Sequence, residues 1–242
     1  MVDTEPGPSQ RLVAPGRSPS LAITPSRQVK VPPVAGMADP AQRVRIFHAL
    51  ANHELQAVEL FAWALLAFSD APKAFRRGLL ATLIDEQRHC QLYIEHIDHL
   101  GSGFGDYPVT GHFWNKLEAI TSPLEFICAM GLTFENANLD FAHEYAEAAL
   151  AAADHRGAAI LREVHRDEIG HVKFAWRWLT KLKGEQHTEW QAYLSNVTWP
   201  LGPARARGRS FDREARQQAG LSEEFIQHLE DTSGKRPGGE PR

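Results

Sequence analysis

The sequence predicts an all-α protein built on a four-helix bundle, and three observations support this prediction. Apolar residues recur at helical spacing through four long segments, which pair in chain order into two hairpins. A long crossover, residues 101–121, separates the two hairpins. No segment shows the alternation of apolar and polar residues that is typical of a strand. Two helical hairpins joined by one long connection are an established bundle topology.

The first hairpin is predicted over residues 40–100. Asp39 followed by Pro40 is typical of an N-cap and first helical position, and apolar residues continue at helical spacing to about Phe68. A turn with Pro72 then starts a second long helix, which we expect to run from about residue 71 to 100. Both helices are long enough for the core of a bundle.

The second hairpin follows the crossover, which we expect to contain a short helical piece at 112–119. Ser122 before Pro123 predicts the start of a third helix, 123–153. After a tight joint, a fourth helix is predicted over 156–182. A short helix within 188–198 and an amphipathic one from Ser222 to about Glu230 are expected beyond it.

The sequence predicts one domain with two flanking segments. Residues 1–36 are rich in proline and contain no aromatic residue, so we expect a mobile tail that cannot bury enough apolar surface to order itself. Residues 37–184 form the predicted bundle. Residues 185–242 form a C-terminal extension of short helices with a frayed end.

Charge and cysteine content exclude several classes of function. A formal net charge of -4 gives no basic field for general nucleic-acid or membrane binding. The chain has two cysteines, Cys90 and Cys128, and no long apolar run, so we expect a cytoplasmic protein without a structural disulfide. We expect both thiols to be buried as small apolar groups.

A repeated Glu-x-x-His motif carries the candidate chemistry. Glu86 and His89 form the first pair, and Glu168 and His171 form the second. Side chains three residues apart on a helix point to nearly the same place, so each pair can bind one metal ion. One pair alone is a weak signal, but its repetition on two predicted helices indicates a metal site.

A single glutamate in an apolar run precedes each pair. Glu59 lies 27 residues before Glu86, and Glu135 lies 33 residues before Glu168. A carboxylate facing an apolar core is costly unless it is bound or neutralised. Together with the two motifs, these residues form a carboxylate-bridged dinuclear pattern. The predicted metal ligands are Glu59, Glu86, His89, Glu135, Glu168 and His171.

Other residues near these positions leave alternatives open. Glu54, Glu144 and Glu147 could replace the single glutamates, although their polar neighbours favour a solvated face. His53 and His165 are interpreted as core or boundary residues, with His165 an alternative ligand. Tyr93, one turn after His89, could be a redox-active phenol or a packing residue. Asp85 and Asp167 each precede a ligand glutamate, and they are expected to accept a hydrogen bond from the ligand histidine of the partner helix. Arg88 is expected to pair with one of these two aspartates.

The span from about Val44 to Thr180 resembles the ferritin-like di-iron carboxylate proteins. The resemblance rests on HELQAVELFAWALLAF, FRRGLL, DEQRH, LTFENANLD and DEIGHVKFAWRWL, and it is closest to an uncharacterised bacterial ferritin-like family. DEQRH is also similar to a motif of di-iron monooxygenases and tRNA hydroxylases. In those relatives, Glu86 and His89 match ligands, and Asp85 and Arg88 match supporting residues. Gly170 stands where Arg88 stands in the first motif and departs from this pattern.

The resemblance and the ligand pattern together predict a dinuclear iron oxidoreductase. Oxygen-rich ligation favours Fe or Mn over Zn, so two Fe ions or an Mn/Fe pair are expected. The expected partners are dioxygen, a small-molecule substrate and an electron donor, in a protein that could form a homodimer. No membrane partner is expected, and tRNA is the one nucleic acid suggested by analogy. The alternative is metal handling, as ferroxidase or peroxide scavenger, without an organic substrate.

Overall fold

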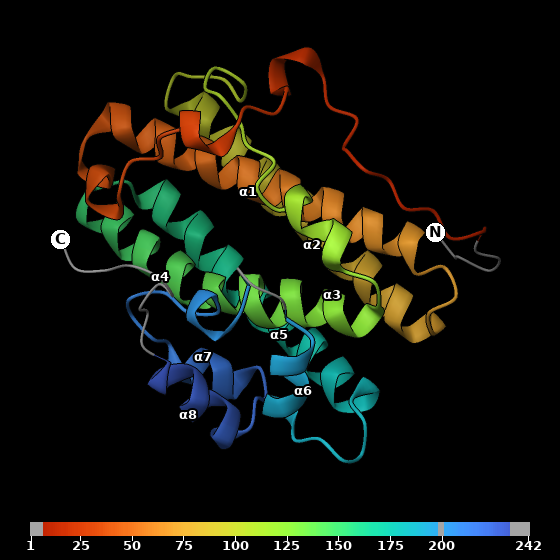
Figure 1. Ribbon diagram of the computed structural model, residues 1–242. Helices are drawn as coiled ribbons and strands as arrows, with labels where there is room; N and C mark the ends of the chain where they lie inside the picture. Colours follow the sequence, from red (N-terminus) through yellow and green to blue (C-terminus); the bar gives the residue numbers. More distant parts are fainter. Residues whose placement is uncertain (1–6, 198–200, 233–242) are drawn as a thin grey trace. The chain divides into compact units, whose positions relative to one another are not determined.

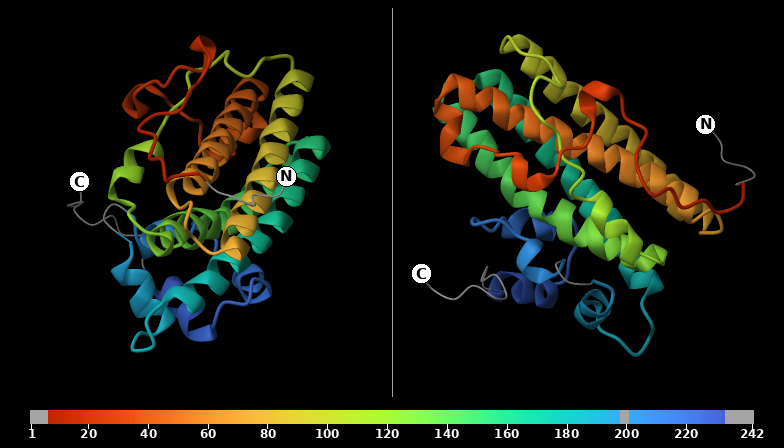
Figure 2. Two further views of the ribbon diagram at one scale, coloured as in Figure 1. Left: turned by 90° about the vertical axis from the view of Figure 1, so that its right-hand side faces the viewer. Right: turned by 45° about the horizontal axis from the view of Figure 1, so that its top comes forward.

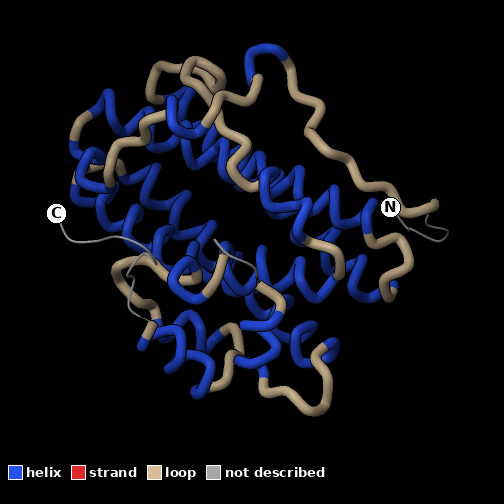
Figure 3. Tube along the Cα trace, viewed as in Figure 1, coloured by secondary structure: helices blue, strands red, loops and turns tan. Residues whose placement is uncertain are grey.

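The computed structural model describes residues 7–197 and 201–232 and is all-helical over that part of the chain (Figures 1 and 3). A single isolated bridge between Ile23 and Val109 is the nearest approach to a strand within these ranges. No helix in them is both long and apolar enough to cross a bilayer. The described ranges contain eight α-helices: α1 Pro40–Ala67, α2 Lys73–His99, α3 Pro123–Ala129, α4 Asn136–Ala151, α5 His155–Leu182, α6 Glu189–Ser195, α7 Arg213–Gln218 and α8 Glu223–Asp231.

The chain divides into two compact units. Unit 1 comprises the described residues up to Ile120 together with Glu147–Ile160, and unit 2 comprises Thr121–Ala146 with the described residues from Leu161 onward. The division falls within α4 and α5, so it does not coincide with the predicted boundaries after residues 36 and 184. We describe each unit by itself.

Unit 1 is organised around the antiparallel pair of α1 and α2 (Figure 2). Asp39 caps α1 by accepting a hydrogen bond from the backbone N–H of Gln42 at 2.9 Å. Gly101, with φ of 84°, follows α2 in the left-handed conformation that glycine adopts without strain. The buried rings of Phe47 and Tyr93 lie 6.0 Å apart between the two helices. Both predicted helices are therefore present, with ends shifted by a few residues.

The N-terminal segment, residues 7–36, is bound to unit 1 and corrects the prediction of a mobile tail. Ser9 donates to the carbonyl of Ala67 at 2.6 Å, and Trp63 donates to the carbonyl of Leu12 at 3.0 Å. Arg17 forms an ion pair with Glu59 at 2.6 Å, with its side chain only 5% exposed. The segment lacks the apolar residues for a core of its own, but it forms hydrogen bonds and an ion pair with α1. Residues 1–6 lie outside the described part.

Unit 2 begins with α3, whose start is a capping box. Ser122 accepts from the backbone of Glu125, and the Glu125 carboxylate accepts from the backbone of Ser122 at 2.9 Å. The predicted continuous helix over 123–153 is wrong in one respect, because a π-helix, Met130–Glu135, separates α3 from α4. This wider turn changes the direction in which the following side chains point.

The C-terminal extension packs within unit 2 as α6, α7 and α8. The expected short helices near 188–198 and after Ser222 are confirmed by α6 and α8, while α7 was not predicted. The predicted frayed end, after about Glu230, lies outside the described residues from position 233 onward. Arg216 of α7 is fully buried and donates to both oxygens of Asp140 on α4, at 2.7 and 2.9 Å. This buried ion pair attaches the extension to the helix that follows the π-helix.

Candidate metal centre

Unit 1 brings together a cluster that we call the unit-1 triad: Glu54 on α1 with Glu86 and His89 on α2. Each residue offers one ligand atom, and these atoms lie within 4.8 Å of one another. The three side chains are buried, Glu86 and His89 completely. His89 Nδ1 lies 3.6 Å from Glu86 Oε2, which confirms that the Glu-x-x-His spacing directs both groups to one place.

The structure does not bring Glu59 into this triad. Its carboxylate accepts hydrogen bonds from Arg17 at 2.6 and 2.8 Å and from Trp114 at 2.7 Å. Glu59 follows Glu54 by five residues, and at about 100° per residue the two side chains point about 140° apart on α1. Glu54 therefore faces α2, whereas Glu59 faces the N-terminal segment and the crossover.

A spacing in the sequence could have identified Glu54. It lies 32 residues before Glu86, which nearly equals the 33 residues between Glu135 and Glu168, whereas Glu59 lies only 27 before Glu86. The polar residues beside Glu54 predicted a solvated face, yet its side chain is 3% exposed. The two halves of the sequence repeat are thus more alike than the predicted ligand set implied.

Unit 2 holds the corresponding unit-2 triad, Glu135, Glu168 and His171, whose ligand atoms also lie within 4.8 Å of one another. His171 Nδ1 lies 3.2 Å from Glu168 Oε2. The amide of Asn138 donates to Glu135 Oε2 at 3.4 Å and to Glu168 Oε1 at 3.3 Å. One neutral amide thus orients both carboxylates of this triad.

Glu135 is placed by the π-helix, which has its own supports. The hydroxyl of Thr133 donates to the carbonyl of Cys128 at 2.8 Å, which satisfies a backbone group in the widened turn. Tyr193 of α6 is buried and lies 2.8 Å from the same hydroxyl. Because burial removes water from its phenol, the pKa of Tyr193 is raised and the group stays protonated.

Glycine at position 131 allows α5 to approach the π-helix closely. A Cβ added at Gly131 would lie 2.3 Å from the Cβ of Ala175 on α5, a distance that real side chains do not adopt. Any other residue would push α5 away from the π-helix. Since Glu135 is on the π-helix and Glu168 is on α5, this close contact helps to bring the two carboxylates together.

The two triads fit divalent metal ions in charge and in donor type. Each has two buried carboxylates close together, which repel each other when ionised and are stabilised by a cation. Each adds one imidazole, a preferred ligand of Fe, Mn and Zn, and two carboxylates favour the metals that accept oxygen ligands. The residues present could therefore hold one divalent ion in each triad.

The remaining predicted residues lie in several places. Arg88 and Asp85 form a 3.9 Å contact, each side chain about 40% exposed, so Arg88 pairs with one of the two expected aspartates. Asp167 is half-buried on α5. The supporting roles of these residues toward the histidines stay predictions. Tyr93 is buried against Phe47, which agrees with a packing role.

The histidines and cysteines outside the triads follow the expected pattern. His53 packs against Phe113 with ring centroids 4.8 Å apart, and His165 lies 3.1 Å from Asp212. Both cysteines are free and buried. Burial, together with the nearby carboxylates of Glu86 and Glu59, raises the pKa of Cys90 to about 11, so its thiol is protonated near neutral pH and is a poor metal ligand.

Comparisons with known proteins identify relatives without a described activity. A family model described as "Protein of unknown function (DUF455)" matches residues 2–227. An uncharacterized protein of Haemophilus influenzae is 28% identical over 148 residues, which cover 57% of this chain and 51% of that protein. The chain thus matches about half the length of this curated relative. No solved structure matches the chain.

Proposed function

The chain belongs to the DUF455 family of proteins of unknown function, and we propose that it is a ferritin-like di-iron protein that uses dioxygen to oxidise or hydroxylate an organic substrate. The observation that carries the proposal is the pair of triads: each combines a single glutamate with a Glu-x-x-His motif and buries all three side chains. In the proposal, each triad binds one metal ion, and the six residues together provide the ligands for two.

The composition of the triads supports this assignment. Four carboxylates balance the charge of two divalent ions, and two neutral imidazoles complete the ligand set, which is the donor set of carboxylate-bridged di-iron proteins. When bound, two iron ions supply the electrons and the coordination positions that dioxygen activation needs; a mixed Mn/Fe pair is the alternative. The protein holds the carboxylates in place before metal binding, as the amide of Asn138 does for Glu135 and Glu168.

Anaerobic reconstitution tests the proposal. The purified protein is loaded with Fe(II), desalted and analysed for metal content, and its consumption of dioxygen is then followed. We expect about two equivalents of iron per chain. The double variant Glu86→Ala/His89→Ala should lose most of this iron, whereas Glu147→Ala, which removes an exposed carboxylate of unit 1, should keep it. Wild-type protein with less than about one equivalent would contradict the proposal.

The same preparation distinguishes an oxygenase from a metal-handling protein. An oxygenase should consume dioxygen faster when a metabolite extract supplies an organic substrate and a reductant supplies electrons. A ferroxidase should consume dioxygen in proportion to added Fe(II), with no response to the extract. A large assembly on gel filtration would additionally favour an iron-storage role.

A further inference from the structure

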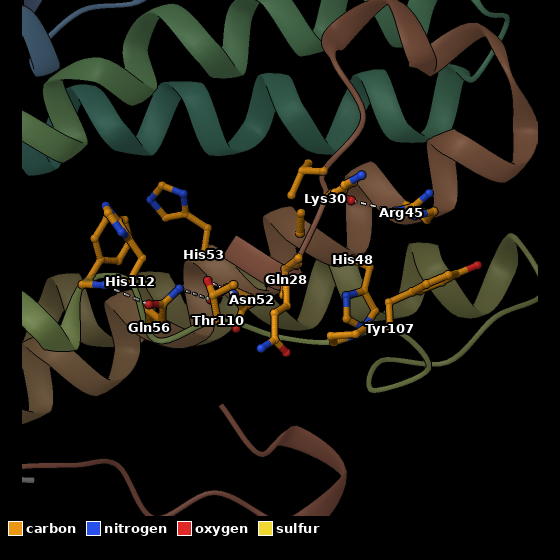
Figure 4. A pocket seen from close by; sticks show the side chains of 15 residues that line it. Gln28, Lys30, Arg45, His48, Asn52, His53, Gln56, Tyr107, Thr110 and His112 are labelled. Atoms are coloured by element: carbon orange, nitrogen blue, oxygen red, sulfur yellow. Dashed lines mark hydrogen bonds between the residues drawn. The ribbon is translucent and has the colours of Figure 1, made fainter. Parts of the chain in front are cut away.

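A pocket of about 370 Å³ lies within unit 1, on the side of α1 that faces the crossover and the N-terminal segment (Figure 4). Its lining comes from three stretches of chain: 28–31, part of α1 from 45 to 56, and 107–113. No residue of the unit-1 triad lines it. The volume falls within the range of about 300–1,000 Å³ that small-molecule sites occupy.

Helix α1 forms the inner wall of the pocket with polar side chains that include His48 and Gln56, two turns apart. His48 Nε2 accepts from the backbone N–H of Gly105 at 3.0 Å, and Gln56 Oε1 accepts from that of Phe113 at 3.1 Å. Because an N–H can only donate, Nε2 of His48 carries no proton and the ring is neutral. Burial also lowers the pKa of His48, which favours the neutral ring. These bonds attach the crossover to α1.

The N-terminal segment, which forms the outer wall of the pocket, is attached to the crossover. The backbone N–H of Thr24 donates to the carbonyl of Val109 at 2.8 Å. A Cβ added at Gly111 would lie 2.6 Å from Ile23, so glycine permits the N-terminal segment to lie close against the crossover. The wall at 28–31 therefore follows a stretch of chain that is already fixed. A preformed pocket of this kind binds a ligand with little ordering cost.

One end of the pocket is positively charged. Lys30 and Arg45 line it, and no aspartate or glutamate does. Arg45 donates to the backbone carbonyl of Lys30 at 2.7 Å, and its guanidinium lies 5.9 Å from the ring centroid of Tyr107. A guanidinium has five N–H donors, so Arg45 retains donors for a ligand. Both cations are exposed and thus accessible at the mouth of the pocket.

The other end is aromatic. Phe113 is buried, and the rings of His53 and His112 lie 4.8 and 5.5 Å from it, centroid to centroid. Figure 4 shows these two histidines at the end opposite Lys30 and Arg45. The pocket thus offers a charged end for an anionic group and an aromatic end for an apolar body.

We propose that this pocket binds a small organic anion, a carboxylate or a phosphate ester, with its charged group at Lys30 and Arg45 and its apolar part toward Phe113. The two cations without a lining acid give the preference for negative charge, and the aromatic end gives the preference for an organic body. Since the triad residues do not line the pocket, binding is expected in metal-free protein as well.

Calorimetric titration with a matched series of probes tests the inference. Benzoate and phenyl phosphate carry the two anionic groups, benzyl alcohol is the neutral counterpart and benzylamine the cationic one. Both anions should bind with saturation, and the tighter of the two identifies the preferred group. Benzyl alcohol and benzylamine should bind at least about tenfold more weakly, because neither carries a negative charge for Lys30 and Arg45 to bind. Metal-free Glu86→Ala protein should bind the anions as well as the wild type does.

Charge variants locate the binding. Lys30→Gln and Arg45→Gln should each weaken anion binding about threefold to tenfold, whereas Arg27→Gln, which removes an exposed cation that does not line the pocket, should leave it unchanged. Circular dichroism of each variant controls for folding, and Lys30→Gln alters only an exposed side chain. Three results would overturn the inference: no saturable anion binding, equal affinity for benzyl alcohol, or an equal loss in Arg27→Gln.

Discussion

The unit-1 and unit-2 triads contain the same residue types but reach their geometry in different ways. In unit 1, Glu54 is on the regular helix α1 and meets Glu86 and His89 through the packing of α1 on α2. In unit 2, Glu135 is at the end of a π-helix, and the turn is supported by Tyr193 from the C-terminal extension. Ordinary helix pairing is enough for one triad, whereas the other needs a local deformation and a brace.

The C-terminal extension supports the elements that position the unit-2 triad. Within unit 2, α6 contacts the π-helix through Tyr193, and α7 contacts α4 through Arg216. A change in the extension should therefore weaken the unit-2 triad. Within unit 1, the triad depends on the packing of α1 on α2.

The largest effect is expected for Arg216→Met, which removes one partner of a fully buried ion pair. Asp140 would be left as a buried carboxylate beside an apolar side chain, so unfolding free energy should fall by about 3–5 kcal/mol. Urea denaturation measures this. The matched control is Arg213→Met on the same helix, because its ion pairs with Glu223 and Glu230 are partly exposed and screened by solvent, so their loss should destabilise the protein much less. Equal losses in both variants would contradict a special role for Arg216.

Gly131→Ala should destabilise the protein by about 1–3 kcal/mol, because the new methyl group would overlap Ala175 and push α5 away from the π-helix. The same change at Gly170 of α5, where the added Cβ would meet nothing within 4 Å apart from its chain neighbours and the backbone of its own helix, should stabilise by about 0.5–1 kcal/mol. Thermal unfolding of the two variants gives the comparison. Gly131→Ala should also lower iron content, and an unchanged content would show that the close approach does not position the triad.

Tyr193→Phe should cost about 0.5–1.5 kcal/mol, since it deletes one buried hydrogen bond to Thr133 but leaves the bond from Thr133 to Cys128. A double-mutant cycle with Thr133→Val measures the coupling between the two hydroxyls. Additive effects of the two substitutions would show that α6 does not brace the π-helix through this contact.

The smallest expected effect is the dependence of stability on pH, which two buried histidines of unit 1 should produce. Burial lowers the pKa of His48 and of His96 below the ordinary 6.5, although Asp106 partly opposes this at His48 and Asp154 does so at His96. Below that value the unfolded chain binds protons that the folded chain does not, so unfolding free energy should fall as the pH drops. Urea denaturation at several pH values measures the slope. His48→Gln and His96→Gln should each reduce it, and an unchanged slope in both would contradict the assignment.

Much of the helical pattern could be predicted from the sequence because it depends on local signals. Proline at the first helical position, the Ser122 cap and apolar spacing located α1, α2, α3 and α5. The π-helix could not be predicted, because it depends on tertiary contacts such as that of Thr133 with Tyr193. The bound N-terminal segment was missed for the same reason: composition describes what a segment can bury by itself and says nothing of hydrogen bonds to a helix.

The sequence predicted those parts of the candidate site whose geometry depends on helix periodicity alone. Both Glu-x-x-His pairs converge as expected, because three residues of helix bring the two side chains together. The structure places Glu54 and not the predicted Glu59 beside Glu86 and His89, because apolar neighbours in the sequence do not reveal which side of α1 faces α2. Glu59 has apolar neighbours, yet it is on the side bound by Arg17 and Trp114.

Iron content of three proteins tests the central claim most directly. Wild type, Glu54→Ala and Glu59→Ala are reconstituted anaerobically with Fe(II) and analysed after desalting. Wild type should hold about two equivalents, Glu54→Ala should lose at least about one, and Glu59→Ala should keep its iron, because Glu59 binds Arg17 and Trp114 instead. Iron retained in Glu54→Ala but lost in Glu59→Ala, or a wild type without iron, would contradict the account.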